Sequence, residues 1–232
     1  MNILTGQLPN LNNYKKGRNS NIKYIVIHYT GNKGDTALNN VKYFKNNVVK
    51  ASAHYFVDQS EIYSSVPVED TAWHCGGNKQ SKYGGKYFGK CTNSNSIGIE
   101  MCLLDKYGNV NLKTFINTVE LTKYLMDKYN ISSENVIRHW DVNGKDCPRP
   151  FTGDNNAYWQ DFKNRINGSD DNMKNEMIYN YIDDNMPEFA KPTIRKLCQK
   201  GFLEGEKDGL NLTYDMLRIF TVLDRAGVFD KE

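Results

Sequence analysis

Two histidines and one cysteine in this chain have the residue types and the placement of a hydrolytic metal site. His139 and Cys147 lie eight positions apart in a turn-rich run, and Gly144 between them allows that run to fold back on itself. His28 closes a β-branched run, Ile25–Ile27, far upstream. A structural zinc normally has four protein ligands, whereas a catalytic zinc keeps one position open for water or substrate. Three candidate ligands therefore predict zinc-assisted hydrolysis.

Two charged residues are candidates for the remaining chemistry. Glu100 follows the apolar run 97–99, where an unpaired carboxylate is costly unless it faces a cleft. Lys145 stands two residues before Cys147, and alternation along an extended segment places both side chains on one side. A cation there would stabilise a developing oxyanion. The alternatives are a salt-bridged strand carboxylate for Glu100 and a solvated loop lysine for Lys145.

The elements that must position these residues alternate between strands and helices. Short apolar or alternating runs predict strands, and apolar residues at helical spacing predict helices. The predicted strands are 22–29, 54–58, 61–67, 97–103 and 136–139, the last ending at His139, and the predicted helices are 36–46, 115–129 and 157–166. This order predicts an α/β fold in which a mixed central β-sheet is flanked by helices.

The remainder of the chain predicts a small second module. Residues 167–172 are small and polar, as in a linker between a catalytic domain, 1–166, and a module over 173–232. That module is expected to be all-helical, with helices over 173–184, 187–200 and 213–226. Its apolar residues are numerous for its length, so we expect some of them to face the catalytic domain, a ligand or a second copy of the chain.

Composition and charge narrow the function classes. Among 232 residues 39% are hydrophobic, and no apolar run approaches the ~20 residues of a membrane span, which is typical of a soluble globular protein. The net charge is +3, and no nucleic-acid-binding signature accompanies it, so nucleic acid is not an expected partner. Residues 1–6 have neither a basic region nor an apolar core, so we expect no secretory signal and synthesis in the cytoplasm.

Four of the five cysteines lie outside the predicted metal site. Synthesis in a reducing cytosol would leave them as thiols. Cys75 and Cys91 bracket a loop rich in Gly and Lys, and whether they pair after release stays open at this point. Cys102 and Cys198 have apolar neighbours and are expected to be buried, inert thiols.

The order of these motifs resembles one family. Five stretches carry the resemblance: 26–31 around His28, 52–58 around His54, 72–74 ending at His74, 95–100 ending at Glu100, and 139–148. Together they resemble the zinc-dependent N-acetylmuramoyl-L-alanine amidases of type 2, whose fold is shared with peptidoglycan recognition proteins and phage lysins. The resemblance covers roughly residues 20–166 and is therefore to a whole domain.

The resemblance implies a substrate and roles for the candidate residues. The substrate would be the amide between N-acetylmuramic acid and L-alanine in bacterial peptidoglycan, cleaved by a phage or prophage endolysin that reaches the cell wall after release by lysis or a separate pore. The module over 173–232 would then bind a cell-wall polymer or self-associate. Glu100 would be the general base and Lys145 the oxyanion-stabilising cation, whereas His54 and His74 would line the substrate cleft, support a metal ligand or serve the core. Some family members carry a tyrosine where this chain has Ala53. The alternative function is a peptidoglycan-recognition protein that binds without cleaving.

Overall fold

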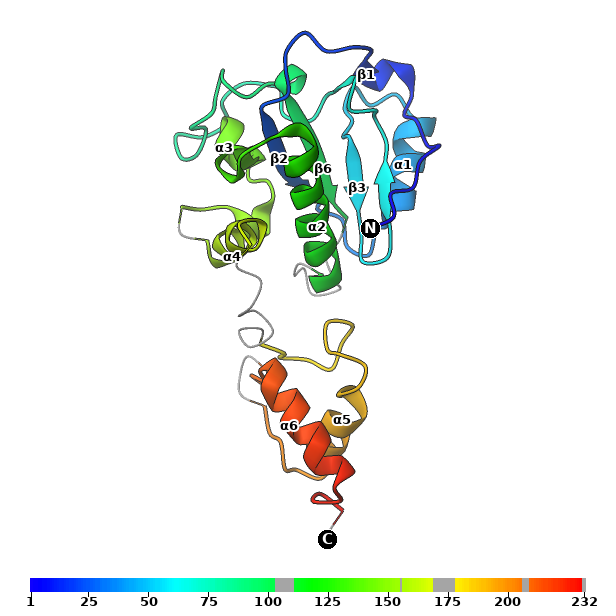
Figure 1. Ribbon diagram of the computed structural model, residues 1–232, viewed down its shortest axis with the longest axis vertical. Coiled ribbons are helices and arrows are strands. Elements are labelled where there is room, and N and C mark those ends of the chain that lie inside the picture. The colour runs from blue at the N-terminus through cyan, green and yellow to red at the C-terminus, as the bar shows by residue number, and fades with distance from the viewer. Residues whose placement is uncertain (103–110, 155, 169–177, 206–208, 231–232) are drawn as a thin grey trace. The chain divides into compact units, whose positions relative to one another are not determined.

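The computed structural model divides the chain into two compact units, Met1–Gly168 and Ser169–Glu232 (Figure 1). It describes residues 1–102, 111–154, 156–168, 178–205 and 209–230. The predicted linker, 167–172, lies largely outside the described residues, as do the end of the predicted strand 97–103 and the start of the predicted helix 173–184.

A five-stranded sheet forms the centre of the first unit, with the strand order β4-β3-β6-β2-β7. Strands β3, β6, β2 and β7 run parallel to one another, and the edge strand β4 pairs antiparallel with β3. The mixed sheet predicted from the sequence is confirmed. Its strands are β2 (Tyr24–Tyr29), β3 (Tyr55–Val57), β4 (Ile62–Ser64), β6 (Ser96–Met101) and β7 (Val136–Arg138).

The two faces of this sheet pack against different sets of residues. Along β2, Ile25 and Ile27 enter the main hydrophobic core, while Val26 packs in a separate cluster with Cys75 and Cys91. Because side chains alternate along a strand, His28 shares the face of Val26. The main core therefore occupies one face, and the candidate metal ligand projects from the other.

Helices cover both faces of the sheet. Helix α2 (Leu112–Tyr129) lies across β6 and β2, as Figure 1 shows, and packs its apolar stripe into the main core together with α4 (Ala157–Ile166). Helix α1 (Ala37–Asn46) packs in a smaller cluster with Phe56 on the other face. Polar side chains cap the first turn of each, since Thr36, Asn111 and Asn156 accept backbone N–H groups there.

Several short elements were not predicted from the sequence. Strands β1 (Tyr14–Lys15) and β5 (Thr71–Ala72) pair in a separate two-stranded sheet. Four 3-10 turns, Leu11–Asn13, Asn93–Asn95, Ser133–Asn135 and Arg149–Phe151, join other elements. The prediction that a strand ends at His139 was wrong by one residue: β7 ends at Arg138, and His139 begins α3 (His139–Asn143).

The second unit has its own hydrophobic core between α5 (Lys191–Gln199) and α6 (Tyr214–Arg225). Two of its three predicted helices are present, the first of them shorter than expected. The described part of the predicted helix 173–184 is not helical: it contains turns and an antiparallel bridge between Tyr179 and Leu212. Tyr179 and Leu212 are buried together in this core, so a contact between distant residues decides the local conformation.

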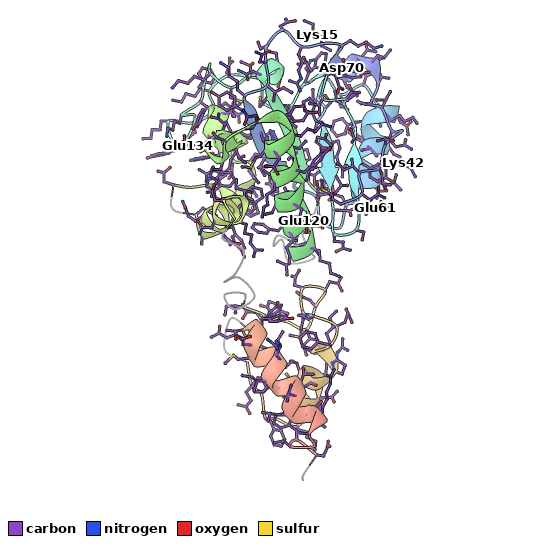
Figure 2. All side chains as sticks on the ribbon, viewed as in Figure 1. Lys15, Lys42, Glu61, Asp70, Glu120 and Glu134 are labelled. Carbon is purple, nitrogen blue, oxygen red and sulfur yellow. The ribbon has the colours of Figure 1, made fainter. Side chains whose placement is uncertain are left out.

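Charged side chains occupy the periphery of the first unit. Figure 2 shows Lys42, Glu120 and Glu134 there, and all three are exposed. In the described segments, no helix combines the length and the apolar character needed to cross a bilayer. All five cysteines are free thiols; Cys75, Cys91 and Cys102 are buried, whereas Cys198 is only partly buried.

Candidate metal centre

Strand β2 positions the first candidate ligand. His28 is the penultimate residue of β2 and is 1% exposed. Parallel neighbours on both sides, β6 and β7, fix the strand backbone. The imidazole Nδ1 of His28 lies 3.7 Å from Sγ of Cys147, and its Nε2 lies 3.0 Å from Nδ1 of His74. The strand therefore holds a buried imidazole with one nitrogen toward the thiol.

The turn-rich segment 138–147 brings in the other two ligands. Arg138 binds Asp141 through its backbone N–H and its guanidinium, which fixes the first turn of α3, where His139 begins the helix. Gly144 ends α3 with a φ of 80°, a conformation that favours glycine. The backbone N–H of Trp140 then donates to the carbonyl of Cys147 at 2.8 Å, so the chain returns to the start of the helix.

These elements converge on one point. One ligand atom each from His28, His139 and Cys147 lies within 4.8 Å of the other two, and all three residues are buried. The imidazole rings of His28 and His139 have centroids 4.6 Å apart. Both ring nitrogens of His139 are buried with no hydrogen-bond partner in the described chain. Buried polar atoms are normally satisfied, so an imidazole without a protein partner fits the role of a metal ligand, which uses one of its two nitrogens.

Burial sets the protonation states that a metal would meet. It lowers the pKa of His28 well below its usual value, and the neighbouring His139 and His74 lower it further. Burial and the positive charge of Lys145 lower the pKa of His139 to about 3. Both imidazoles are therefore neutral at pH 7, as metal ligation requires. Burial raises the pKa of Cys147 to about 12, so a metal must displace the thiol proton.

Glu100 lies beside the candidate ligands on the neighbouring strand. It is the register partner of His28 between β6 and β2. Its Oε2 is buried, and no described residue gives that oxygen a hydrogen bond. Burial raises the pKa of Glu100 to about 7, although the positive charge of Lys145 opposes that shift. A carboxyl group with a pKa near neutrality can both accept and donate a proton at pH 7, as a general acid and base must.

Lys145 is an exposed charged residue beside the candidate ligands. Its backbone N–H is held by the side chain of Asn143 at 3.1 Å, and its carbonyl accepts the N–H of Cys147 at 2.7 Å. Its ammonium lowers the pKa of Glu100 and opposes the burial that raises the pKa of Cys147. The turn thus presents one cation to the candidate ligands while leaving it accessible to solvent.

His54 and His74 occupy different environments. His54 is fully buried; its Nδ1 accepts the N–H of Gly98 at 3.0 Å, and its Nε2 lies 3.3 Å from the carbonyl of Asp70. Nη2 of Arg18 also lies 2.6 Å from Nε2 of His54, so polar contacts from three segments hold this ring in the interior. His74 is partly exposed and contacts the ligand His28 directly. A substrate contact for either histidine stays a prediction.

A cavity of about 410 Å³ lies elsewhere in the first unit, because none of the three candidate ligands is among its lining residues. Trp73, Phe88 and Asn143 are among its lining residues, together with the loop glycines Gly76 and Gly77. Sequence reasoning missed Asn93, another lining residue, whose side chain accepts the backbone N–H groups of His74 and Cys75. An asparagine in a polar turn carries no signal for such a long-range contact.

Comparison with known proteins places this site in a family. The family model described as N-acetylmuramoyl-L-alanine amidase matches residues 18–150, more than half of the chain. The chain belongs to the N-acetylmuramoyl-L-alanine amidase family. The matched range contains every candidate ligand together with Glu100 and Lys145.

Individual relatives of this amidase-family chain match about 70% of its length. N-acetylmuramoyl-L-alanine amidase BlyA from Bacillus subtilis (strain 168) is 34% identical over 175 residues, which are 72% of this chain and 47% of the relative. N-acetylmuramoyl-L-alanine amidase XlyA from the same strain is 33% identical over 170 residues, 72% of this chain and 52% of the relative. The chain thus spans about half the length of these two relatives.

Solved structures support the amidase fold of the first unit. A mutant endolysin from Bacillus subtilis is 34% identical and aligns with a TM-score of 0.57 over 72% of this chain and 99% of its own. The catalytic domain of XlyA is 33% identical and gives the same TM-score over the same shares. The central sheet with flanking helices is therefore the fold of endolysin catalytic domains.

Proposed function

We propose that the first unit hydrolyses the amide between N-acetylmuramic acid and L-alanine in bacterial peptidoglycan, with a zinc ion held by His28, His139 and Cys147. The observation that carries the proposal is the convergence of three buried ligand atoms, two of them contributed by neutral imidazoles. Among the described residues, neither ring nitrogen of His139 has a hydrogen-bond partner. Two nitrogens and one sulfur suit zinc, and three protein ligands leave a position for water or substrate.

The chemistry divides between the ion and the side chains around it. When bound, zinc supplies a Lewis acid that activates water at neutral pH. Glu100 takes the proton from the attacking water through its free Oε2 and delivers it to the amide nitrogen as the C–N bond breaks. Its pKa of about 7 allows it to carry the proton in either direction near neutrality.

Lys145 stabilises the negative charge that develops on the substrate. Attack of water on the amide carbonyl places a negative charge on the carbonyl oxygen, and a nearby ammonium stabilises it. Because Lys145 is exposed while Cys147 beside it is buried, its side chain can meet a substrate arriving from solvent. No tyrosine precedes His54 here, so the cation and the carboxylate supply the polar groups around the scissile bond.

The family and the solved structures support peptidoglycan as the substrate and the bacterial cell wall as the place of action. We place the protein among phage or prophage endolysins that reach the wall after release from the cytoplasm. The second unit, with a core of its own, would tether the enzyme to a wall polymer or to a second copy of the chain.

One experiment separates hydrolysis from recognition alone. The purified protein is loaded with zinc and incubated with peptidoglycan. The products are analysed for new free amino termini on L-alanine and for new reducing ends on the glycan strands. Amidase action releases new L-alanine amines with no new reducing ends. Binding without any new chemical end would establish the recognition alternative, and new reducing ends would assign a glycosidase.

A further inference from the structure

A chain of hydrogen bonds runs from the metal ligand His28 into the body of the first unit. Nε2 of His28 lies 3.0 Å from Nδ1 of His74, and Nε2 of His74 lies 3.2 Å from Oγ of Ser96. The hydroxyl of Ser96 in turn donates to the carbonyl of Thr92 at 2.6 Å. The chain thus ends at a backbone acceptor whose role is fixed.

The direction of each hydrogen bond follows from that end. A carbonyl oxygen only accepts, so the single proton of Ser96 points to Thr92, and Ser96 must accept from Nε2–H of His74. In the tautomer that has its one N–H at Nε2, His74 has a lone pair at Nδ1 and accepts from Nε2–H of His28. Nδ1 of His28 is then left unprotonated, and this is the nitrogen that lies 3.7 Å from Sγ of Cys147.

The surroundings of His74 keep its ring in this place. Its backbone N–H donates to the side chain of Asn93 at 3.0 Å. The ring packs over β6 where that strand has Gly98, and a Cβ on Gly98 would come within 2.5 Å of Cγ of the His74 ring. Ser96, the acceptor, is fully buried in the same strand. Strand β6 therefore supplies both the space for the imidazole and its hydrogen-bond partner.

We propose that His74, backed by Ser96, is a positioning residue that holds His28 in the tautomer and orientation that bind the metal through Nδ1. The proposal rests on the zinc site proposed above and adds the residues that preset it. Both ring nitrogens of His74 take part in this series of hydrogen bonds, one with His28 and one with Ser96. His74 therefore acts through His28 rather than on the substrate. Partners that orient metal-bound histidines in this way typically contribute about 10–100-fold to metal affinity or activity, and we expect an effect of the same order for His74.

The first test measures zinc affinity by chelator competition in the full chain. His74→Phe keeps a ring but removes both nitrogens, and its zinc dissociation constant is expected to rise about 10–100-fold. His74→Asn keeps an acceptor near the position of Nδ1 and should recover part of the loss. Ser96→Ala should weaken zinc binding less than His74→Phe, because it removes only the outer partner.

A matched control is available for the serine. Ser65 is 1% exposed, and its hydroxyl has no partner among the described residues, so Ser65→Ala tests removal of a buried hydroxyl outside the chain of hydrogen bonds. Its zinc affinity should equal that of the wild type. Equal affinities for the wild type and a folded His74→Phe would overturn the positioning role.

The second test reads the tautomers directly and does not depend on activity. Long-range ¹H–¹⁵N NMR spectra of histidine-labelled protein are expected to show His28 and His74 both protonated at Nε2, in the metal-free protein as well as with zinc. A proton on Nδ1 of His74 would refute the assigned direction. If the wild type binds no zinc but shows these tautomers, the zinc hypothesis fails while the hydrogen-bond chain stands.

Discussion

Glu100 faces His28 as its direct register partner across the parallel strands β6 and β2. Two adjacent strands therefore place a half-buried glutamate and a buried imidazole side by side on the face opposite the main core. A shift of either strand by one residue in the pairing register would turn the side chain of Glu100 or His28 into that core, so the register is fixed at both positions. The pairing of the two strands thus fixes the distance between the proposed base and the proposed metal ligand.

Removing the carboxylate should separate chemistry from metal binding. Glu100→Gln retains all three ligands, so zinc content should stay at about one per chain, while peptidoglycan hydrolysis falls about 10²–10⁴-fold. Lys145→Ala should give the same pattern through the loss of oxyanion stabilisation. Elemental analysis and the rate of release of L-alanine amines measure the two effects. A Glu100→Gln variant that hydrolyses at the wild-type rate would rule out the proposed base.

Removing a ligand should act on the metal first. In Cys147→Ser a hydroxyl replaces the only sulfur of the proposed site, so zinc content and hydrolysis should both be lost while the circular dichroism spectrum remains that of the wild type. Cys198→Ser is the matched control, because Cys198 is a free thiol in the second unit. It should keep both properties. Unchanged zinc in Cys147→Ser would remove Cys147 from the site.

The raised pKa of Glu100 predicts a pH dependence of stability in the metal-free protein. Its folded-state pKa of about 7 lies above the usual 4.5, so the folded state binds the proton more tightly than the unfolded state. Stabilisation by the protonated group is full below the usual pKa and is lost as pH rises toward 7, by at most about 3 kcal/mol. Glu100→Gln has no such proton. Its free energy of unfolding, relative to the wild type, should therefore rise with pH.

Urea denaturation of chelator-treated protein at about pH 5 and pH 8 measures that difference. The histidines are common to both proteins, so their titration largely cancels in the comparison. A stability difference that is the same at both pH values would show that Glu100 is not desolvated in the folded state.

The two-unit organisation predicts separable functions. A chain ending at Gly168 retains the central sheet, the main core and every proposed site residue. Hydrolysis of small soluble muropeptides should be nearly unchanged, while lysis of intact cells should weaken, because a tether raises the local concentration of the enzyme at the wall. If the truncated, zinc-loaded protein loses activity on soluble fragments too, the second unit takes part in the chemistry.

The sequence predicts the sheet well because its signals are local. The apolar runs around Ile25 and Ile97 become β2 and β6, and the helical stripe beginning at Phe115 becomes part of α2. The convergence of His28, His139 and Cys147 was also predicted, but on family resemblance and residue chemistry rather than on periodicity.

The remaining features depend on contacts between distant residues. The turn 178–184 forms where the sequence suggested a helix, because Tyr179 pairs with Leu212. The link from His74 to Ser96 requires that a loop histidine meet a strand serine 22 positions away. Hydrophobic spacing and turn propensity describe neither contact, since both are decided only when the chain packs.

The separation of the proposed ligands along the chain has a consequence for folding. His28 and Cys147 are 119 positions apart and belong to different ends of the first unit's sequence. An ion bound to both is a cross-link that closes a long loop, and such a closure removes conformational entropy from the unfolded chain. The same ion would therefore slow the opening of the sheet and protect it from proteases in a lysed culture. Chelation would expose the protein to degradation at the same moment as it stops catalysis.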